Sequence, residues 1–277
     1  MSPTVSVVIP LFNGLPFVEK ALESVLNQTR PVDEIIITDG GSKDGSREWL
    51  RTLNISNLIW EALPEGTSAA QNWTRCSELA TGDYVKLLCQ DDFLYPHAIA
   101  LQVTDLESHP ECAMAVSKRD IVDATERIIA SARGCQGLEA GLVDGPEAIK
   151  TSYIKGTNIF GEPLSVLFRR DAMMGALPWD DDNPYVLDIL FYTRVLAHSS
   201  LYVRNETLGA FRVSESSWST HLASFQKSQF QSWQRSALPS LTPLSTRERI
   251  TANANVRLQT LTRRLAYGYL SVRRRLQ

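Results

Sequence analysis

The sequence lacks several features that would assign its 277 residues to other classes of protein. No stretch approaches the ~18 consecutive apolar residues that a membrane-spanning helix needs, so we expect none. No basic leader or signal cleavage site precedes the first strand-like segment, so we expect no signal peptide. The four cysteines do not have the spacing of a metal site, and we expect reduced thiols in a cytoplasmic environment.

A strong net charge is absent as well. The formal charge is −3, which argues against a nucleic-acid partner. The charge is unevenly spread, because residues 245–277 contain eight arginines and one glutamate. This segment carries +7 and the remainder of the chain carries −10. The hydrophobic fraction, 43%, is ordinary for a globular protein with one large domain, or one domain and an extension.

Strands and helices alternate over about the first 110 residues. Apolar, β-branched runs predict buried strands, and apolar residues three or four positions apart predict helices. The expected strands are 5–9, 34–38, 57–61 and 84–88. The expected helices are 18–26, one starting at 46, 68–79 and 96–106. This alternation predicts an α/β fold with a parallel, doubly wound sheet.

The pattern changes after residue 110. Residues 113–117 and 121–130 are typical of mixed or antiparallel strands, and 134–145 is a glycine-rich, loop-like segment. Further strands are expected at 165–168, 200–203 and 207–213, with a helix at 186–197. From about residue 222 we expect helices, interrupted at 239–243.

Two adjacent carboxylates, Asp91 and Asp92, follow the apolar run 84–89. A strand that ends in them places negative charge at the carboxyl edge of the sheet, where ligands bind in open α/β folds. Paired carboxylates at this edge commonly hold a divalent cation that bridges nucleotide phosphates. The alternative is a solvated turn that leads into the next helix.

Four motifs in the same order and spacing resemble family 2 glycosyltransferases of the GT-A fold. They are residues 5–14 (VSVVIPLFNG), 37–46 (ITDGGSKDGS), the Gly-Asp-Tyr and Gln-Asp-Asp within 82–92, and 185–188 (YVLD). The resemblance covers about residues 4–215 and implies a Rossmann-like mixed sheet with helices on both faces. It implies a domain at 1–221, with a nucleotide-sugar-binding half at 1–110 and an acceptor-binding half at 111–221. A basic, amphipathic helical extension at 222–277 follows.

The resemblance implies an inverting enzyme that moves one sugar from a nucleotide-diphosphate sugar to a hydroxyl of a glycan or lipid-linked acceptor. Bacterial surface polysaccharide synthesis is the implied setting. By resemblance, Mn²⁺ or Mg²⁺ stabilises the leaving diphosphate, with Asp92 as the direct ligand and Asp91 beside it near the ribose. The implied nucleotide-sugar-binding residues are Pro10, Leu11, Asn13, Asp39, Gly41, Gln71 and Asp91.

Asp39 ends an expected strand, where a carboxylate can accept a hydrogen bond from a nucleobase, as in uracil or thymine recognition in the family. Gly41 permits the positive φ and close backbone approach that a ligand site needs. The alternative is a turn that enters the next helix, capped by Ser42 or Asp44. The two interpretations are compatible.

Asp188 stands where the family has its general base, which must reach the acceptor hydroxyl. A helix cap is the alternative function of Asp188. The acidic run Trp179-Asp180-Asp181-Asp182 competes for the role, but we interpret it as a solvated loop because three adjacent carboxylates repel. Gly161-Glu162-Pro163 resembles a loop of the family that approaches donor and acceptor, which implies that Glu162 contacts a sugar hydroxyl. The alternative is that Glu162 only forms a turn.

Two other functions fit parts of the pattern. A nucleotidyltransferase has a similar sheet, but it typically carries a basic, glycine-rich loop where residues 10–14 contain no Lys or Arg. A catalytically inactive sugar-nucleotide-binding partner protein would explain four departures from the family motifs. These are Gly40, Gln71, Cys89 and Ser214, where the family has Asp, Arg, an acid and His.

The basic segment 245–277 has apolar residues mostly three or four positions apart. They are Ile250, Ala254, Leu258, Leu261, Leu265, Val272 and Leu276. A basic amphipathic helix of this kind binds an anionic membrane surface. The alternatives are that the apolar stripe packs on the catalytic domain or on a second copy of the chain in a homo-oligomer.

Overall fold

The computed structural model describes residues 2–214, 222, 225–237 and 243–274, with the side chains of 263–274 left aside. Its strands form one sheet in the order β3-β2-β1-β4-β9-β6-β10-β5, with β7 paired to β6 and β8 to β10. The strands are β1 (Val5–Leu11), β2 (Glu34–Asp39), β3 (Leu58–Ala62), β4 (Tyr84–Leu87), β5 (Phe93–Leu94), β6 (Cys112–Val122), β7 (Ile128–Arg133), β8 (Gly141–Asp144), β9 (Val166–Arg169) and β10 (Ser200–Arg212).

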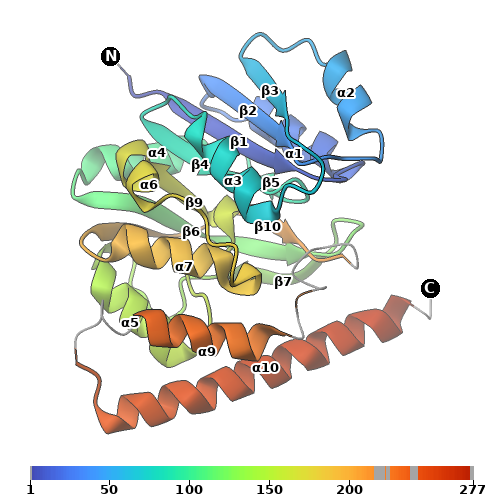
Figure 1. The fold of residues 1–277 in the computed structure, drawn as a ribbon. Helices are drawn as coiled ribbons and strands as arrows, with labels where there is room; N and C mark the ends of the chain where they lie inside the picture. The colour runs from blue at the N-terminus through green and yellow to red at the C-terminus, as the bar shows by residue number, and fades with distance from the viewer. Residues whose placement is uncertain (1, 215–221, 223–224, 238–242, 275–277) are drawn as a thin grey trace.

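Helices cover both faces of this sheet (Figure 1). They are α1 (Phe17–Leu26), α2 (Ser46–Thr52), α3 (Ala69–Glu78), α4 (Ala98–Ser108), α5 (Gly145–Lys155), α6 (Arg170–Ala176), α7 (Leu187–Leu196), α9 (Gln226–Ala237) and α10 (Thr246–Arg274), with short 3₁₀ turns η1 (Pro163–Ser165) and η2 (Pro184–Val186). Buried side chains of α1, α2 and α4 pack on one face, and those of α3, α5, α6, α7 and α9 on the other. The predicted α/β class is therefore confirmed.

The first half of the chain forms the parallel part of the sheet. β1 lies between β2 and β4 and is parallel to both, with Leu11 opposite Asp39 and Val8 opposite Leu87. All seven residues of β1 are buried, because helices cover both of its sides. The carboxyl ends of β1, β2 and β4 consequently meet at one edge of the sheet.

The second half differs from the expectation at several points. The expected break between 117 and 121 is wrong, since β6 runs through it with Arg119 and Asp120 buried in the strand. Likewise β10 is one strand with a register shift between Arg204 and Thr207. The segment 134–145 is not all loop, because β8 lies within it and α5 begins at its end. The α5 cap, Asp144 followed by proline in the first turn, is a sequence signal that went unused.

The C-terminal helices pack on the domain. Trp233 of α9 is buried in the core, and its indole N–H donates to Thr193 of α7 at 2.9 Å. α10 lies along α5 and α9, as Figure 1 shows. Its contact face contains the buried Ala252 and Val256, and a Cβ on Gly156 would lie 2.5 Å from the backbone nitrogen of Val256. Small residues thus allow the close approach of these helices. The proposed boundary at 221/222 stays a prediction.

The apolar stripe expected on the C-terminal helix points away from this contact face. Ile250, Leu258 and Leu261 are 65%, 57% and 59% exposed, and Ala254 is exposed between them. We call these four residues the outer stripe. The alternative in which the stripe packs on the catalytic domain is therefore wrong for its described members. Leu265, Val272 and Leu276 lie outside the described side chains. No described helix has the length and apolar character needed to cross a membrane.

Candidate functional site

Side chains lock together the three loops that follow β1, β2 and β4. Gln90 pairs with the Phe12 backbone in both directions, accepting its N–H at 2.7 Å and donating to its carbonyl at 2.9 Å. Asn13 donates its backbone N–H to Ser42 Oγ at 2.8 Å, and its side-chain oxygen accepts the N–H of Lys43 at 2.8 Å. These contacts bring the sequence motifs at 5–14, 37–46 and 82–92 to one edge of the sheet.

The carboxylate of Asp92 is buried and only partly satisfied. The residue is 1% exposed, and Oδ1 accepts the backbone N–H of Arg212 at 3.0 Å. Oδ2 is buried and has no hydrogen-bond partner among the described residues. Burial raises the pKa of Asp92 well above its usual value, and the neighbouring Asp91 raises it further, while Arg212 lowers it. When ionised, this carboxylate is only partly compensated, and a hard cation with oxygen ligands is a further group that fits.

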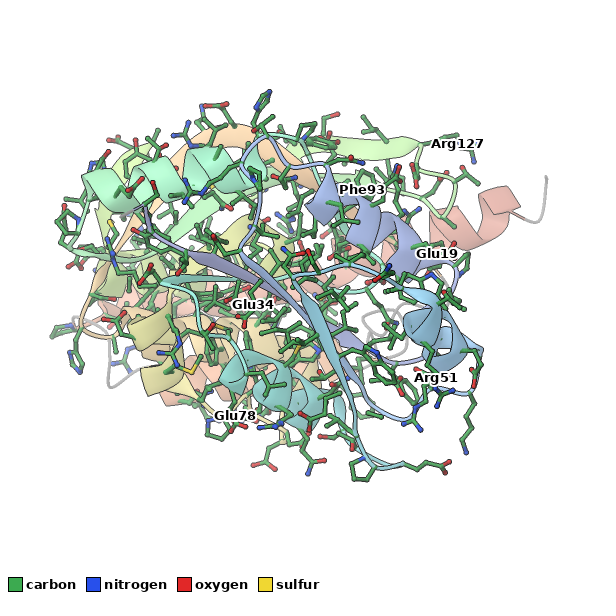
Figure 2. The ribbon with its side chains drawn as sticks, turned by 90° about the horizontal axis from the view of Figure 1, so that it is seen from above. Glu19, Glu34, Arg51, Glu78, Phe93 and Arg127 are labelled. Atoms are coloured by element: carbon green, nitrogen blue, oxygen red, sulfur yellow. The ribbon has the colours of Figure 1, made fainter. Side chains whose placement is uncertain are left out.

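Arg212 holds the acidic pair in place and was missed among the sequence candidates. Its side chain is buried, and Nε donates to the Asp91 carbonyl at 2.9 Å. The guanidinium lies over the rings of Phe17, at 4.7 Å, and Phe93, at 5.5 Å. Figure 2 shows Phe93 next to α1, near the β6–β7 turn that carries Arg127. One local signal could have drawn attention to Arg212, which stands between the apolar residues Phe211 and Val213 at the end of a strand-like segment.

Cys89 lies among the acidic residues of the site. Burial raises the pKa of its thiol well above the ordinary value, and four carboxylates raise it further. They belong to Asp91, Asp92, Asp188 and Glu162. The residues predicted to bind the metal, to act as the base and to contact the acceptor come from three separate segments, and all lie within electrostatic reach of this one thiol. Within the described residues, no three His, Cys, Asp or Glu side chains form a ready-made metal cluster.

Asp39 is completely buried at the end of β2 and has internal partners. Its carboxylate accepts the Ser42 N–H at 3.1 Å and pairs with Arg47. Ser42 does not cap α2, since its hydroxyl binds Asn13. Asp44 is not the N-cap residue either, because Gly45 holds that position, but its carboxylate accepts the N–H of Ser46, the first residue of α2, at 3.0 Å. The turn interpretation therefore accounts for much of this carboxylate's hydrogen bonding, and a nucleobase contact by Asp39 stays a prediction.

Of the other residues predicted to bind the nucleotide sugar, Gln71 has a local structural partner and Gly41 has an unusual backbone conformation. Gln71 is exposed in the first turn of α3 and forms a capping box with Ser68, accepting its N–H at 3.0 Å. The adjacent Asn72 donates to the carbonyl of Leu11 at 3.0 Å and accepts from Thr38 at 2.6 Å, tying α3 to the ends of β1 and β2. Gly41 has φ +101°, which a residue with a side chain rarely adopts.

Asp188 lies half-buried in the first turn of α7, as expected. Its Oδ2 accepts a hydrogen bond from Asn158 Nδ2 at 2.7 Å. Asn158, which sequence reasoning missed, also donates to the carbonyl of Gly161 at 3.0 Å. The following residue, Glu162, forms an ion pair with the buried Arg119 of β6. Asn158 thus joins the Gly161-Glu162-Pro163 loop to Asp188.

The competing acidic run is only partly a solvated loop. Asp181 and Asp182 are exposed, and Asp180 turns its carboxylate back to accept the N–H of Asp182 at 2.9 Å. Trp179 is instead 3% exposed and stacks on Phe191 with ring centroids 3.7 Å apart. The expectation of a solvated loop is therefore wrong for Trp179, because its large apolar ring is buried beside α7.

Comparisons with known proteins identify a family and several relatives of this chain. A model of the family described as glycosyl transferase family 2 matches residues 6–173. An uncharacterized glycosyltransferase of Rickettsia typhi is 25% identical over 76% of this chain and 64% of its own length. An uncharacterized protein of Mycobacterium tuberculosis is 26% identical over 72% and 64%. The chain thus spans less than two thirds of these curated relatives. The putative teichuronic acid biosynthesis glycosyltransferase TuaG of Bacillus subtilis is 38% identical over 32% of this chain and 36% of TuaG.

Solved structures show the same fold. S. aureus TarS in complex with UDP-GlcNAc gives a TM-score of 0.69 at 16% identity, covering 91% of this chain and 71% of that one. The mannosyltransferase PcManGT from Pyrobaculum calidifontis, in complex with GDP-Man and Mn²⁺, gives 0.63 at 15% identity, covering 92% and 70%. The expected GT-A type of α/β fold is confirmed by these matches.

Proposed function

Because the chain belongs to glycosyl transferase family 2, we propose that it is an inverting, metal-dependent glycosyltransferase. It moves one sugar from a nucleotide-diphosphate sugar to a hydroxyl of a glycan or lipid-linked acceptor, in the synthesis of a bacterial surface polysaccharide. The observation that carries the proposal is the buried, unpartnered Oδ2 of Asp92 beside Asp91, at the sheet edge where ligands bind.

Asp92 and Asp91 would hold Mn²⁺ or Mg²⁺. The orphaned oxygen of Asp92 and the hard oxygen donors of this pair fit such an ion. When bound, the cation stabilises the negative charge that develops on the leaving diphosphate. Arg212 keeps both acidic residues oriented through the Asp92 carboxylate and the Asp91 carbonyl.

The loops at the ends of β1 and β2 would bind the nucleotide. Pro10, Leu11, Asn13, Asp39, Gly41 and Gln71 are the proposed contacts. Phe12 adds an exposed aromatic ring, 53% accessible, whose backbone Gln90 fixes in both directions. A fixed, exposed ring at this edge is suited to stacking on a nucleobase.

Asp188 would remove the proton from the acceptor hydroxyl as that oxygen attacks the sugar. With one base and no covalent nucleophile, a single displacement inverts the anomeric centre. Glu162, held by Arg119, would contact a sugar hydroxyl near Asp188. Four carboxylates around Cys89 support a site in which donor, cation and acceptor meet.

We also propose that α10 lies on an anionic membrane surface, which places the enzyme at the inner face of the cytoplasmic membrane. The outer stripe is exposed, and Arg247, Arg249 and Arg257 are exposed on the same helix. Apolar side chains flanked by arginines favour a surface of anionic lipid. A second copy of the chain is the competing occupant of this surface.

Thermal unfolding tests the donor site directly. The midpoint is measured with UDP or GDP, each with and without Mn²⁺ or Mg²⁺, because a ligand that binds the folded state raises it. We expect a nucleotide-dependent rise that requires the metal in the wild type and is lost in Asp92→Asn. Asp182→Asn, which removes an exposed carboxylate, is the matched control. A rise that Asp92→Asn retains in full contradicts the metal assignment.

Binding without turnover separates the main alternative. If nucleotides bind with metal but no sugar is transferred or hydrolysed, the chain is an inactive sugar-nucleotide-binding partner. Binding of a nucleoside triphosphate with release of pyrophosphate identifies a nucleotidyltransferase instead.

A further inference from the structure

The amide of Asn158 uses every hydrogen-bonding position that it has. Its Oδ1 accepts the backbone N–H groups of Phe160, at 2.9 Å, and Gly161, at 3.3 Å. Its Nδ2 donates one hydrogen to the Gly161 carbonyl and the other to Asp188 Oδ2. A flipped amide would place its NH₂ group against two N–H donors. The orientation is therefore fixed, and Asn158 faces Asp188 as a donor.

We propose that Asn158 is a positioning residue that orients the carboxylate of Asp188 and keeps it ionised for proton removal. The proposal rests on the proposed role of Asp188 as the base. Asn158 is itself held by the backbone of residues 160–161, so the donor reaches Asp188 from a rigid turn. Asn158 holds Oδ2 of Asp188, and the backbone N–H of Ile189 donates to Oδ1 at 2.7 Å, so the carboxylate keeps a constant direction toward the acceptor.

The surroundings of Asp188 explain why such a donor is needed. Asp188 lies close enough to Cys89 and Tyr192 to raise the pKa of both groups, and Asp91, Asp92 and Glu162 also raise the pKa of Cys89. Neighbouring carboxylates disfavour ionisation of one another. Arg119, which lowers the pKa of Tyr192, is paired with Glu162. A neutral amide that donates to Asp188 favours its ionised form without cancelling the negative charge that a metal site requires.

Two substitutions distinguish this role from simple support of the turn. Asn158→Asp keeps the size of the side chain and an oxygen for the two N–H groups. It cannot donate, and it places a second carboxylate within hydrogen-bond distance of Asp188. Asn158→Ala removes all four bonds. Asn255→Ala is the matched control, because Asn255 donates to a backbone carbonyl, that of Ile154 at 2.7 Å, in the contact between α10 and α5.

The first readout is the ionisation of Asp188, which needs no acceptor. In protein labelled with ¹³C at aspartate carboxyls, the Asp188 resonance is the one that disappears in Asp188→Asn. We expect its titration midpoint to rise by about one pH unit or more in Asn158→Asp. A smaller rise is expected in Asn158→Ala, and none in Asn255→Ala. Midpoints equal to the wild type in both Asn158 variants would overturn the proposal.

The second readout is turnover, measured as metal-dependent release of UDP from UDP-GlcNAc or GDP from GDP-Man. We expect Asn158→Ala to lower kcat by about 10- to 100-fold, the effect of losing a charge-assisted hydrogen bond, with the donor KM unchanged. The acidic limb of the pH–rate profile should move to higher pH, because a base with a raised pKa ionises later. A purely structural role predicts no such movement.

Asp188→Asn, assayed in parallel, separates the two proposals. If Asp188→Asn is inactive and Asn158→Ala turns over like the wild type, the positioning role is wrong and the base assignment stands. If Asp188→Asn turns over normally, the base assignment is wrong. The carboxyl titration then still reports whether Asn158 controls the ionisation of Asp188.

Discussion

Asp39 ends β2, and Asp92 lies in the loop after β4 at the same edge of the sheet. Both aspartates are buried, but their surroundings are opposite in character. Asp39 has an arginine partner and a backbone N–H from its own turn. Asp92 has one backbone donor, the electrostatic attraction of Arg212, an acidic neighbour and an oxygen without a hydrogen-bond partner among the described residues. Burial alone therefore does not identify a ligand site. The difference in direct pairing does, because a buried carboxylate that is only partly compensated is stabilised by a further positive group.

The same comparison extends to Asp188, which raises the pKa of Cys89 as Asp91 and Asp92 do, and which accepts a hydrogen bond from the neutral amide of Asn158. If Asp188 is the base, Asp188→Asn should bind donor nearly normally and transfer sugar about 10²- to 10⁴-fold more slowly. Asparagine preserves the size of the side chain and its place in the first turn of α7. Donor binding by calorimetry and turnover by nucleotide release measure the two effects separately. Near-normal turnover would assign the base elsewhere, and Asp180 to Asp182 would be examined first.

The β4 end is tested by Asp92→Asn, with stability measured in the absence of metal. Removing a buried, incompletely paired charge should leave the free energy of unfolding unchanged or raise it by up to about 2 kcal/mol. Metal-dependent stabilisation by UDP or GDP, about 2.7 kcal/mol at a 100-fold excess over Kd in the wild type, should be lost. Urea unfolding with and without Mn²⁺ and nucleotide measures both. A strongly destabilised apo variant would show that Asp92 is a structural acid like Asp39.

At the β2 end, the corresponding substitution should lower the free energy of unfolding. Asp39→Asn removes the partner of Arg47, whose side chain is 27% exposed, and weakens the acceptor of the Ser42 N–H. We expect a loss of about 1–3 kcal/mol in the free energy of unfolding, the cost of leaving a hydrogen-bonding partner unpaired. Asp182→Asn serves as the control for removing one negative charge. A stability equal to that of the wild type would remove the contrast between the two strand ends.

Sequence patterns predict the first half of this molecule better than the second. The apolar runs of β1, β2 and β4 leave little alternative to buried parallel strands, so the edge that carries Asp91 and Asp92 is predictable. β6 is less so, because Arg119 and Asp120 interrupt its apolar pattern and are tolerated only through tertiary partners. The same reason hides Asn158 and Arg212. Their roles depend on contacts 30 and 120 residues away, which no local pattern reveals.

The final and smallest expected effect concerns a second contrast, between two exposed apolar surfaces. The outer stripe lies on a helix with exposed arginines, whereas Ile128 and Ile129 of β7 are 57% and 41% exposed on a strand. Helical period predicted the outer stripe, but the small residues of the opposite face decide which side packs on α5. Leu258→Ser with Leu261→Ser should weaken sedimentation with liposomes that contain anionic lipid by about tenfold, the loss expected if the two leucines together remove about 55 Å² of apolar surface from water on binding. Ile128→Ser with Ile129→Ser is the matched control and should sediment like the wild type. High salt should reduce binding of the wild type to the liposomes, because the arginines contribute electrostatically.

Equal sedimentation of both double variants, or binding that salt does not change, would contradict the proposal that α10 lies on a membrane surface. Analytical ultracentrifugation of the same proteins would then show whether a second copy of the chain covers the outer stripe.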